Sequence, residues 1–104
     1  MQMLPPGLKR ETEIAEAAAE VERLLAPDVV SIRYKITTDW SDEWAVYFRA
    51  VLSYEAAEKR LLDTASKVEE RLADRLDFEE LGLNAYHHYR SASEQAVLRD
   101  ETWK

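Results

Sequence analysis

The chain has 104 residues, with 21 Asp and Glu against 14 Lys and Arg, a formal net charge of -7 and no cysteine. This length suits one domain with its own hydrophobic core, and the lack of cysteine excludes a disulfide framework and a thiolate nucleophile. The acidic balance disfavours nonspecific attraction to nucleic acid or anionic lipid, although a net charge leaves room for a local basic patch.

Neither a targeting segment nor a membrane span is expected. The N-terminus has no basic stretch followed by an apolar run, and the later apolar runs are far shorter than the about 20 residues that cross a bilayer. We therefore expect a cytoplasmic protein that binds no membrane, with residues 1–104 forming a single α+β domain. The abundance of Ala, Arg, Glu and Leu suggests a bacterial source.

The first regular element predicted is a helix over residues 9–26. Residues 1–7 end in Pro5-Pro6-Gly7, a sequence that stops regular structure, so we expect them to form a flexible N-terminal segment. Apolar residues from Ile14 to Leu25 then recur at steps of three and four, as on one buried helix face. Pro27 ends the helix, because proline disfavours helical geometry in the residue before it.

Two runs with a period of two follow, over residues 29–38 and 44–54, and predict strands with one face on the core and one in water. The short polar linker 39–43 joins them as an antiparallel hairpin. The inward set is Val30, Ile32, Tyr34 and Ile36 on the first run and Trp44, Val46, Phe48, Ala50 and Leu52 on the second. The outward set then brings together two cations of the first run, Arg33 and Lys35, with Tyr47 and Arg49 of the second.

The second half of the chain predicts a helix, a strand and a short helix. Ser53 is the expected N-cap of one long helix, whose apolar stripe passes through Ala57 and Leu61 to Leu76. Asp77 to Gly82 forms a short capped turn that Gly82 closes in left-handed geometry. Residues 83–90 predict a third strand, and the capping box of residues 91–94 opens a terminal helix with Trp103 near its end.

The register of the third strand stays open, because aromatic residues occur on both parities. In one register Asn84, Tyr86, His88 and Arg90 face outward with the cations of the hairpin. In the other register the two histidines exchange faces and Arg90 leaves the outer face.

The predicted order is α-β-β-α-β-(short α), which favours a two-layer α+β sandwich. We expect a three-stranded antiparallel sheet with the third strand beside the first and with the helices packed on one face. Such a sheet has open edges, which invite pairing with a partner strand or with a second copy in a homodimer.

The outer face of the sheet is the predicted partner-binding site. It carries residue types that are enriched at interface hot spots, and the predicted set is Arg33, Lys35, Tyr47, Arg49, Tyr86, His88 and Arg90. We expect a small non-catalytic protein-binding module, by analogy with antitoxins, immunity proteins and other inhibitory subunits, that holds a protein of unknown identity through this face or an open edge.

Two alternatives use the same strands. The outer aromatic residues and cations are also suited to single-stranded RNA, although the acidic chain lacks the motif of an RNA-recognition domain and we place nucleic acid behind protein. A small enzyme would use His87 or His88 with carboxylates from elsewhere in the fold.

No cofactor is expected, since only Gly7 and Gly82 are present and no nucleotide-binding glycine motif exists. No metal site is expected either, because adjacent strand residues point to opposite faces and His87 and His88 cannot readily bind one ion.

Overall fold

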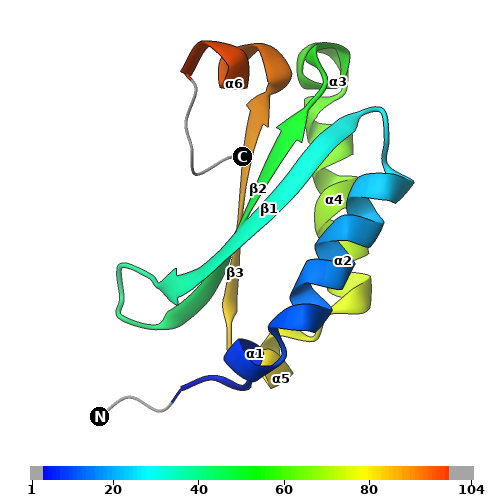
Figure 1. Cartoon of the computed structure of the whole chain (residues 1–104). Coiled ribbons are helices and arrows are strands. Elements are labelled where there is room, and N and C mark those ends of the chain that lie inside the picture. The colour runs from blue at the N-terminus through cyan, green and yellow to red at the C-terminus, as the bar shows by residue number, and fades with distance from the viewer. Residues whose placement is uncertain (1–3, 99–104) are drawn as a thin grey trace.

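A computed structural model of the chain describes residues 4–98, which form helices packed on a three-stranded mixed sheet (Figure 1). The predicted α+β class and the order α-β-β-α-β-α are confirmed. The elements are α1 (Pro6–Lys9), α2 (Glu11–Leu24), β1 (Val29–Thr38), β2 (Trp44–Leu52), α3 (Tyr54–Lys59), α4 (Leu61–Arg75), α5 (Phe78–Leu81), β3 (Asn84–Ser91) and α6 (Ala92–Leu98).

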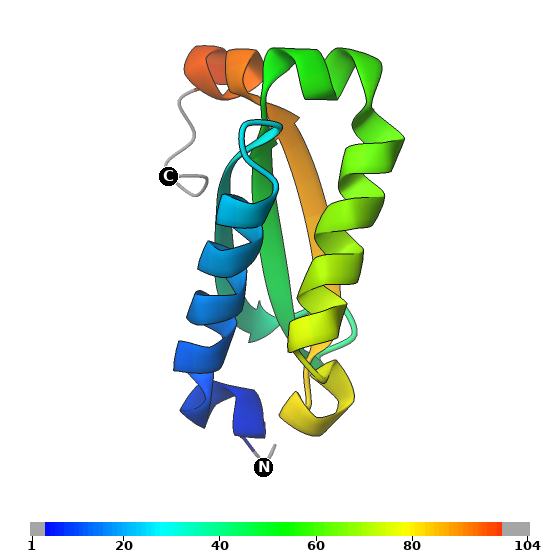
Figure 2. The same cartoon turned by 90° about the vertical axis from the view of Figure 1, so that its right-hand side faces the viewer.

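The two long helices, α2 and α4, lie beside each other on one face of the sheet (Figures 1 and 2). The core fills the space between them and the sheet, with Ile14 and Val21 of α2, Phe48 of β2, and Val68 and Leu72 of α4 all buried. The terminal helix α6 lies at one end of the sheet, on the side away from α2 and α4 (Figure 1). No helix in the described part of the chain combines the length and the apolar character that a bilayer crossing requires.

The strand order is β1-β2-β3, which corrects the predicted place of the third strand. β1 and β2 pair antiparallel, as the short linker predicted, but β3 pairs with β2 and runs parallel to it. The predicted antiparallel pairing of the third strand with the first is therefore wrong. Its physical reason lies in the connection: α3 and α4 carry the chain from the end of β2 back along the sheet, so the next strand starts at the same end as β2.

A bulge near the start of β1 corrects one inward position. Val29 lies opposite Leu52 and Ser31 lies opposite Val51, so one extra residue stands in β1. As a result Val29 is buried, whereas Val30, which was expected to face the core, is 52% exposed. Beyond the bulge the predicted alternation of β1 holds, with Ile32 buried and Arg33 exposed.

The predicted single helix after Ser53 is divided into α3 and α4 at Arg60, whose backbone leaves helical geometry at φ -139° and ψ 31°. The Arg60 guanidinium donates to both carboxylate oxygens of Asp28, at 2.8 and 3.3 Å, and so ties this corner to the start of β1. The direction of the chain changes there, with α3 crossing the end of the molecule and α4 running along the sheet (Figure 2). The break moves Leu61 out of the buried stripe, and Thr64 is buried instead.

The helix caps follow the sequence closely. The side chains of Ser53, Asp77 and Ser91 accept hydrogen bonds from the backbone N–H groups of Ala56, Glu80 and Glu94. At the N-terminus the prediction was wrong for Pro6 and Gly7, which belong to α1 instead of an irregular segment. Gly7 is buried against Leu81 and Leu83, and this packing holds the short helix α1 in place. Trp103 lies outside the described residues.

Gly82 gives a direct test of the turn before β3. Its φ of +69° lies in the left-handed region, and an added Cβ would also lie 3.2 Å from Cδ of Pro6. We predict that Gly82→Ala lowers the free energy of unfolding by about 1–2 kcal/mol, measured by urea denaturation. Gly82→Asn should lose less, because Asn tolerates this geometry. An Ala variant as stable as the wild type would show that this turn is not constrained.

Candidate functional site

The pairing of β3 with β2 decides the register that the sequence left open. Tyr47 lies opposite Tyr86, and Arg49 lies opposite His88. The register with Tyr86, His88 and Arg90 outward is therefore the correct one. All predicted binding residues share the sheet face away from α2 and α4, which we call the outer face: Arg33, Lys35, Tyr47, Arg49, Tyr86, His88 and Arg90.

Three aromatic rings stack at the centre of the outer face. The Tyr47 ring lies between its neighbours, with its centroid 5.1 Å from that of Tyr86 and 6.0 Å from that of His88. Both pairs are nearly parallel, with interplanar angles of 19° and 22°. His88 is exposed and the two tyrosines are half-buried, so the stack presents ring surface and edges to solvent.

Cations surround this stack. Arg33 and Arg49 lie directly opposite each other on β1 and β2, and Lys35 lies opposite Tyr47. Like charges at opposite positions of neighbouring strands destabilise a sheet. Arg33 relieves part of this repulsion at the edge, where its Nη1 lies 3.4 Å from a carboxylate oxygen of Glu22. Farther along, Arg90 donates to Gln95 of α6 at 3.1 Å.

The hairpin loop is anchored to the outer face through Asp39. One carboxylate oxygen accepts from Ser41 N–H, Ser41 Oγ and Glu43 N–H, and the other accepts from Tyr86 OH at 2.8 Å and Asn84 Nδ2 at 3.3 Å. These hydrogen bonds, first that of Ser41, hold the pKa of Asp39 well below its usual value. The bond to Asp39 also raises the pKa of Tyr86, so its phenol stays protonated.

The same loop exposes a tryptophan that is not among the predicted binding residues. Trp40 is 90% exposed at the tip of the hairpin, and Asp42 closes the loop with a φ of +66°. The sequence signal for this residue is a tryptophan within an otherwise polar turn. A large apolar side chain is not needed to make a turn, so its presence there indicates a role in contacts with a partner.

His87 and Tyr89 point to the helices instead of the outer face. The His87 ring stacks on Phe48 with a centroid distance of 5.5 Å, and its Nε2 is buried without a hydrogen-bond partner. Burial lowers the pKa of His87 and favours the neutral imidazole. Tyr89 OH lies 2.7 Å from a carboxylate oxygen of Glu69. The two histidines thus lie on opposite faces of β3 and do not share a site.

Among residues 4–98, no three His, Cys, Asp or Glu side chains gather in a way that would hold a metal ion. His87 and His88 point to opposite faces of β3, and the carboxylates of Asp39 and Glu43 in the hairpin loop accept hydrogen bonds from Glu43 N–H and Asn84 Nδ2, respectively.

Comparisons with known proteins give a fold and no family. No family model matches the chain, and no curated sequence is significantly similar to it. The metal-bound C-terminal domain of the CzcD transporter from Thermotoga maritima shares the fold with a TM-score of 0.55 and 13% identity, over 80% of this chain and 92% of that one. The metal-bound C-terminal domain of the CzcD transporter from Cuprividus metallidurans gives a TM-score of 0.45 and 18% identity, over 73% and 94% of the two chains. The first likeness shows that the α+β fold of this chain also occurs as a small domain of a transporter.

Asp39 provides a pH-dependent test of the site. We predict that Asp39→Asn lowers the free energy of unfolding near pH 7, because an amide would turn a donor toward Tyr86 or Ser41. A carboxyl group with a lowered folded-state pKa stabilises the fold above its unfolded pKa, and this contribution is lost as the pH falls through the folded value. The difference between wild type and variant should therefore shrink below about pH 4 in urea unfolding curves.

The control is Asp63→Asn, which removes an exposed carboxylate of α4 that is paired with Lys67. It should change stability little at any pH. A deficit of Asp39→Asn that stayed constant down to pH 2 would contradict the assigned role of the Asp39 carboxylate.

Proposed function

We propose that this chain is a small non-catalytic protein-binding module whose outer face holds an acidic surface of another protein. The observation that carries the proposal is the gathering of basic and aromatic side chains on one face of the sheet in an otherwise acidic chain. A stoichiometric inhibitor or regulatory subunit, in the manner of an antitoxin or an immunity protein, would use a face of this kind.

The charge distribution supports an acidic partner. The chain carries a net charge of -7, yet Arg33, Lys35, Arg49 and Arg90 all lie on the outer face. Complementary potentials of this kind steer association and exclude partners of the wrong charge. They also favour a different, acidic protein over a second copy of this chain on the outer face, because two copies would bring the same cations together.

The aromatic stack supports a pre-organised surface. Tyr86 is fixed at both ends, by its ring on Tyr47 and by its hydroxyl on Asp39. Because these rings are already held in place, a partner that packs on them has to order few of their rotamers. The entropic cost of binding is lower as a result. Tyr and Arg are the residue types that most often carry the binding energy of such interfaces.

Single-stranded RNA is the second candidate, because the Tyr47, Tyr86 and His88 rings form a stack with cations beside it. Bases stack on such rings while cations hold the phosphates. The acidic chain and its three-stranded sheet favour protein over RNA. The two candidates differ in what remains bound after nuclease treatment.

We predict that Arg33→Glu/Arg49→Glu reduces recovery of the partner by about tenfold or more, because it reverses two neighbouring cations beside the aromatic stack of the outer face. The measurement is a native pull-down of the tagged chain from its own host, with half of the lysate treated with nuclease. The matched control, Lys59→Glu/Lys67→Glu, makes the same change of charge on α3 and α4 and should leave recovery unchanged.

Circular dichroism shows whether each variant keeps its fold. One protein retained with and without nuclease by the wild type and the control, but lost by Arg33→Glu/Arg49→Glu, is the expected result. Co-purified RNA, with protein lost on nuclease treatment, would favour the RNA candidate. A folded Arg33→Glu/Arg49→Glu variant that still recovers the partner normally would remove the outer face as the binding site.

A further inference from the structure

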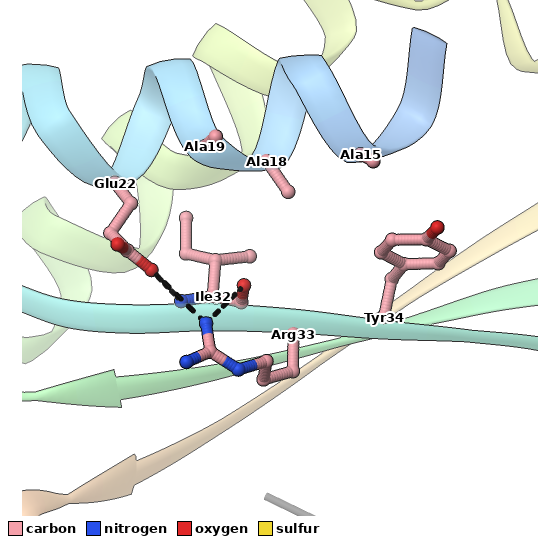
Figure 3. Close-up of a pocket in the computed structure, with 7 residues that line it drawn as sticks. All are labelled: Ala15, Ala18, Ala19, Glu22, Ile32, Arg33 and Tyr34. Atoms are coloured by element: carbon pink, nitrogen blue, oxygen red, sulfur yellow. Dashed lines mark hydrogen bonds and ion pairs between the residues drawn. The ribbon is translucent and has the colours of Figure 1, made fainter. Parts of the chain in front are cut away.

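The two edges of the sheet differ in how they are covered. At the β1 edge, Glu22 of α2 accepts a hydrogen bond from the Ile32 N–H at 2.8 Å, and Glu11 accepts one from Tyr34 OH at 2.9 Å. Figure 3 shows Glu22 reaching from α2 to the strand across a pocket lined by small alanines. The Ile32 N–H is thus taken by a side chain, which hinders pairing with another strand in the middle of this edge.

The β3 edge has no neighbouring strand within the described part of the chain, where β3 pairs with β2 alone. At its last residue the Ser91 N–H donates to Glu94 at 3.2 Å, and the preceding part of this edge is suited to a further strand. Beside it lies a groove of about 560 Å³, between β3 and the helices α3 and α4. His87 lines this groove, and its buried Nε2 lacks a partner.

The helix side of the groove exposes leucines. Leu61 is 45% exposed and Leu62 is 83% exposed, next to Ala65 on the same wall. They are exposed because the chain leaves helical geometry at Arg60 and α4 begins directly after it. Adjacent exposed leucines beside an open strand edge give an added strand an apolar surface to cover.

Carboxylates frame these leucines. Glu58 of α3, Glu69 of α4 and Glu94 of α6 line the groove, whereas Arg90 is the one Lys or Arg among its described lining residues. The groove therefore favours a cationic occupant, in contrast to the basic outer face. A second copy fits poorly: antiparallel pairing of two β3 edges about a two-fold axis would set α4 beside its symmetry mate, with Glu58 and Glu69 of both copies close together.

We propose that the β3 edge and this groove bind an extended, basic segment of another protein as an added strand. Alternate side chains of the added strand face the groove, where apolar ones cover Leu61 and Leu62 and Lys or Arg pair with Glu58 and Glu69. The groove adjoins the outer face, because His88 and Arg90 line it too, but its leucines and glutamates lie outside that face. The proposal does not depend on the function proposed for the outer face.

The test uses the purified full chain and a defined probe, the blocked peptide Ser-Lys-Thr-Leu-Thr-Lys-Ser, which places two lysines and one leucine on one side of a strand. Binding is followed by NMR, from chemical-shift changes and from slowed hydrogen exchange of β3 amides. The control peptide carries Glu in place of both Lys residues. The variants are Leu62→Asp and Glu58→Gln/Glu69→Gln, with Leu24→Asp as the matched control because Leu24 is 49% exposed at the end of α2.

We expect the lysine peptide to shift and protect β3 amides, and the glutamate peptide to bind much more weakly. Glu58→Gln/Glu69→Gln should lower the affinity for the lysine peptide about tenfold, which is the loss expected from removing two exposed ion pairs. Leu62→Asp should abolish the apolar contact and weaken binding further, while Leu24→Asp should not. Gln at position 69 can still accept the Tyr89 hydroxyl, so this variant keeps the fold.

Three results would overturn the proposal. The first is no binding of the lysine peptide at millimolar concentration, or equal binding of both peptides. The second is binding that Arg33→Glu/Arg49→Glu abolishes and Leu62→Asp leaves intact, which would place the peptide on the outer face. The third is dimerisation of the chain without peptide, seen by sedimentation equilibrium and lost in Leu62→Asp, which would make a second copy the occupant.

Discussion

The parallel pairing of β2 and β3 is the constraint on which the rest of the structure depends. Parallel neighbours require a crossover connection, and here α3 and α4 supply it. The crossover places α4 next to α2 on one face of the sheet, where both bury their apolar stripes. The same connection leaves the outer face to polar and aromatic side chains and makes β3 an edge strand. Core, outer face and open edge therefore follow from one pairing.

The surfaces that result have opposite charge. Cations lie on the outer face around the stacked rings of Tyr47, Tyr86 and His88, whereas carboxylates line the groove beside the β3 edge. In both places the arrangement is fixed by hydrogen bonds between segments that are distant in the chain: Asp39 holds the hairpin loop against Tyr86, and Arg60 holds the corner between α3 and α4 against Asp28. Such fixed surfaces lower the ordering cost of recognition.

Sequence patterns predicted the α+β class, the order of the elements, the hairpin and the caps at Ser53, Asp77 and Ser91, because these depend on residues close together in the chain. They also placed Arg33, Lys35, Tyr47 and Arg49 on one face. They could not fix the partner of β3 or its direction, which depend on tertiary packing of the crossover. The bulge at Val30 and the break at Arg60 escaped detection for a related reason, since strand pairing and the bond to Asp28 join distant segments.

Hydroxyl-radical footprinting of the chain, free and with its partner bound, tests whether the outer face is the binding surface, because it reports the solvent exposure of individual side chains. We expect Tyr47, Tyr86 and His88 to lose reactivity in the complex, while Tyr54, which is 63% exposed on α3, keeps it. Unchanged reactivity of the three stacked rings, together with protection of Tyr54 or of the helices α2 and α4, would contradict the assignment of the outer face as the binding surface.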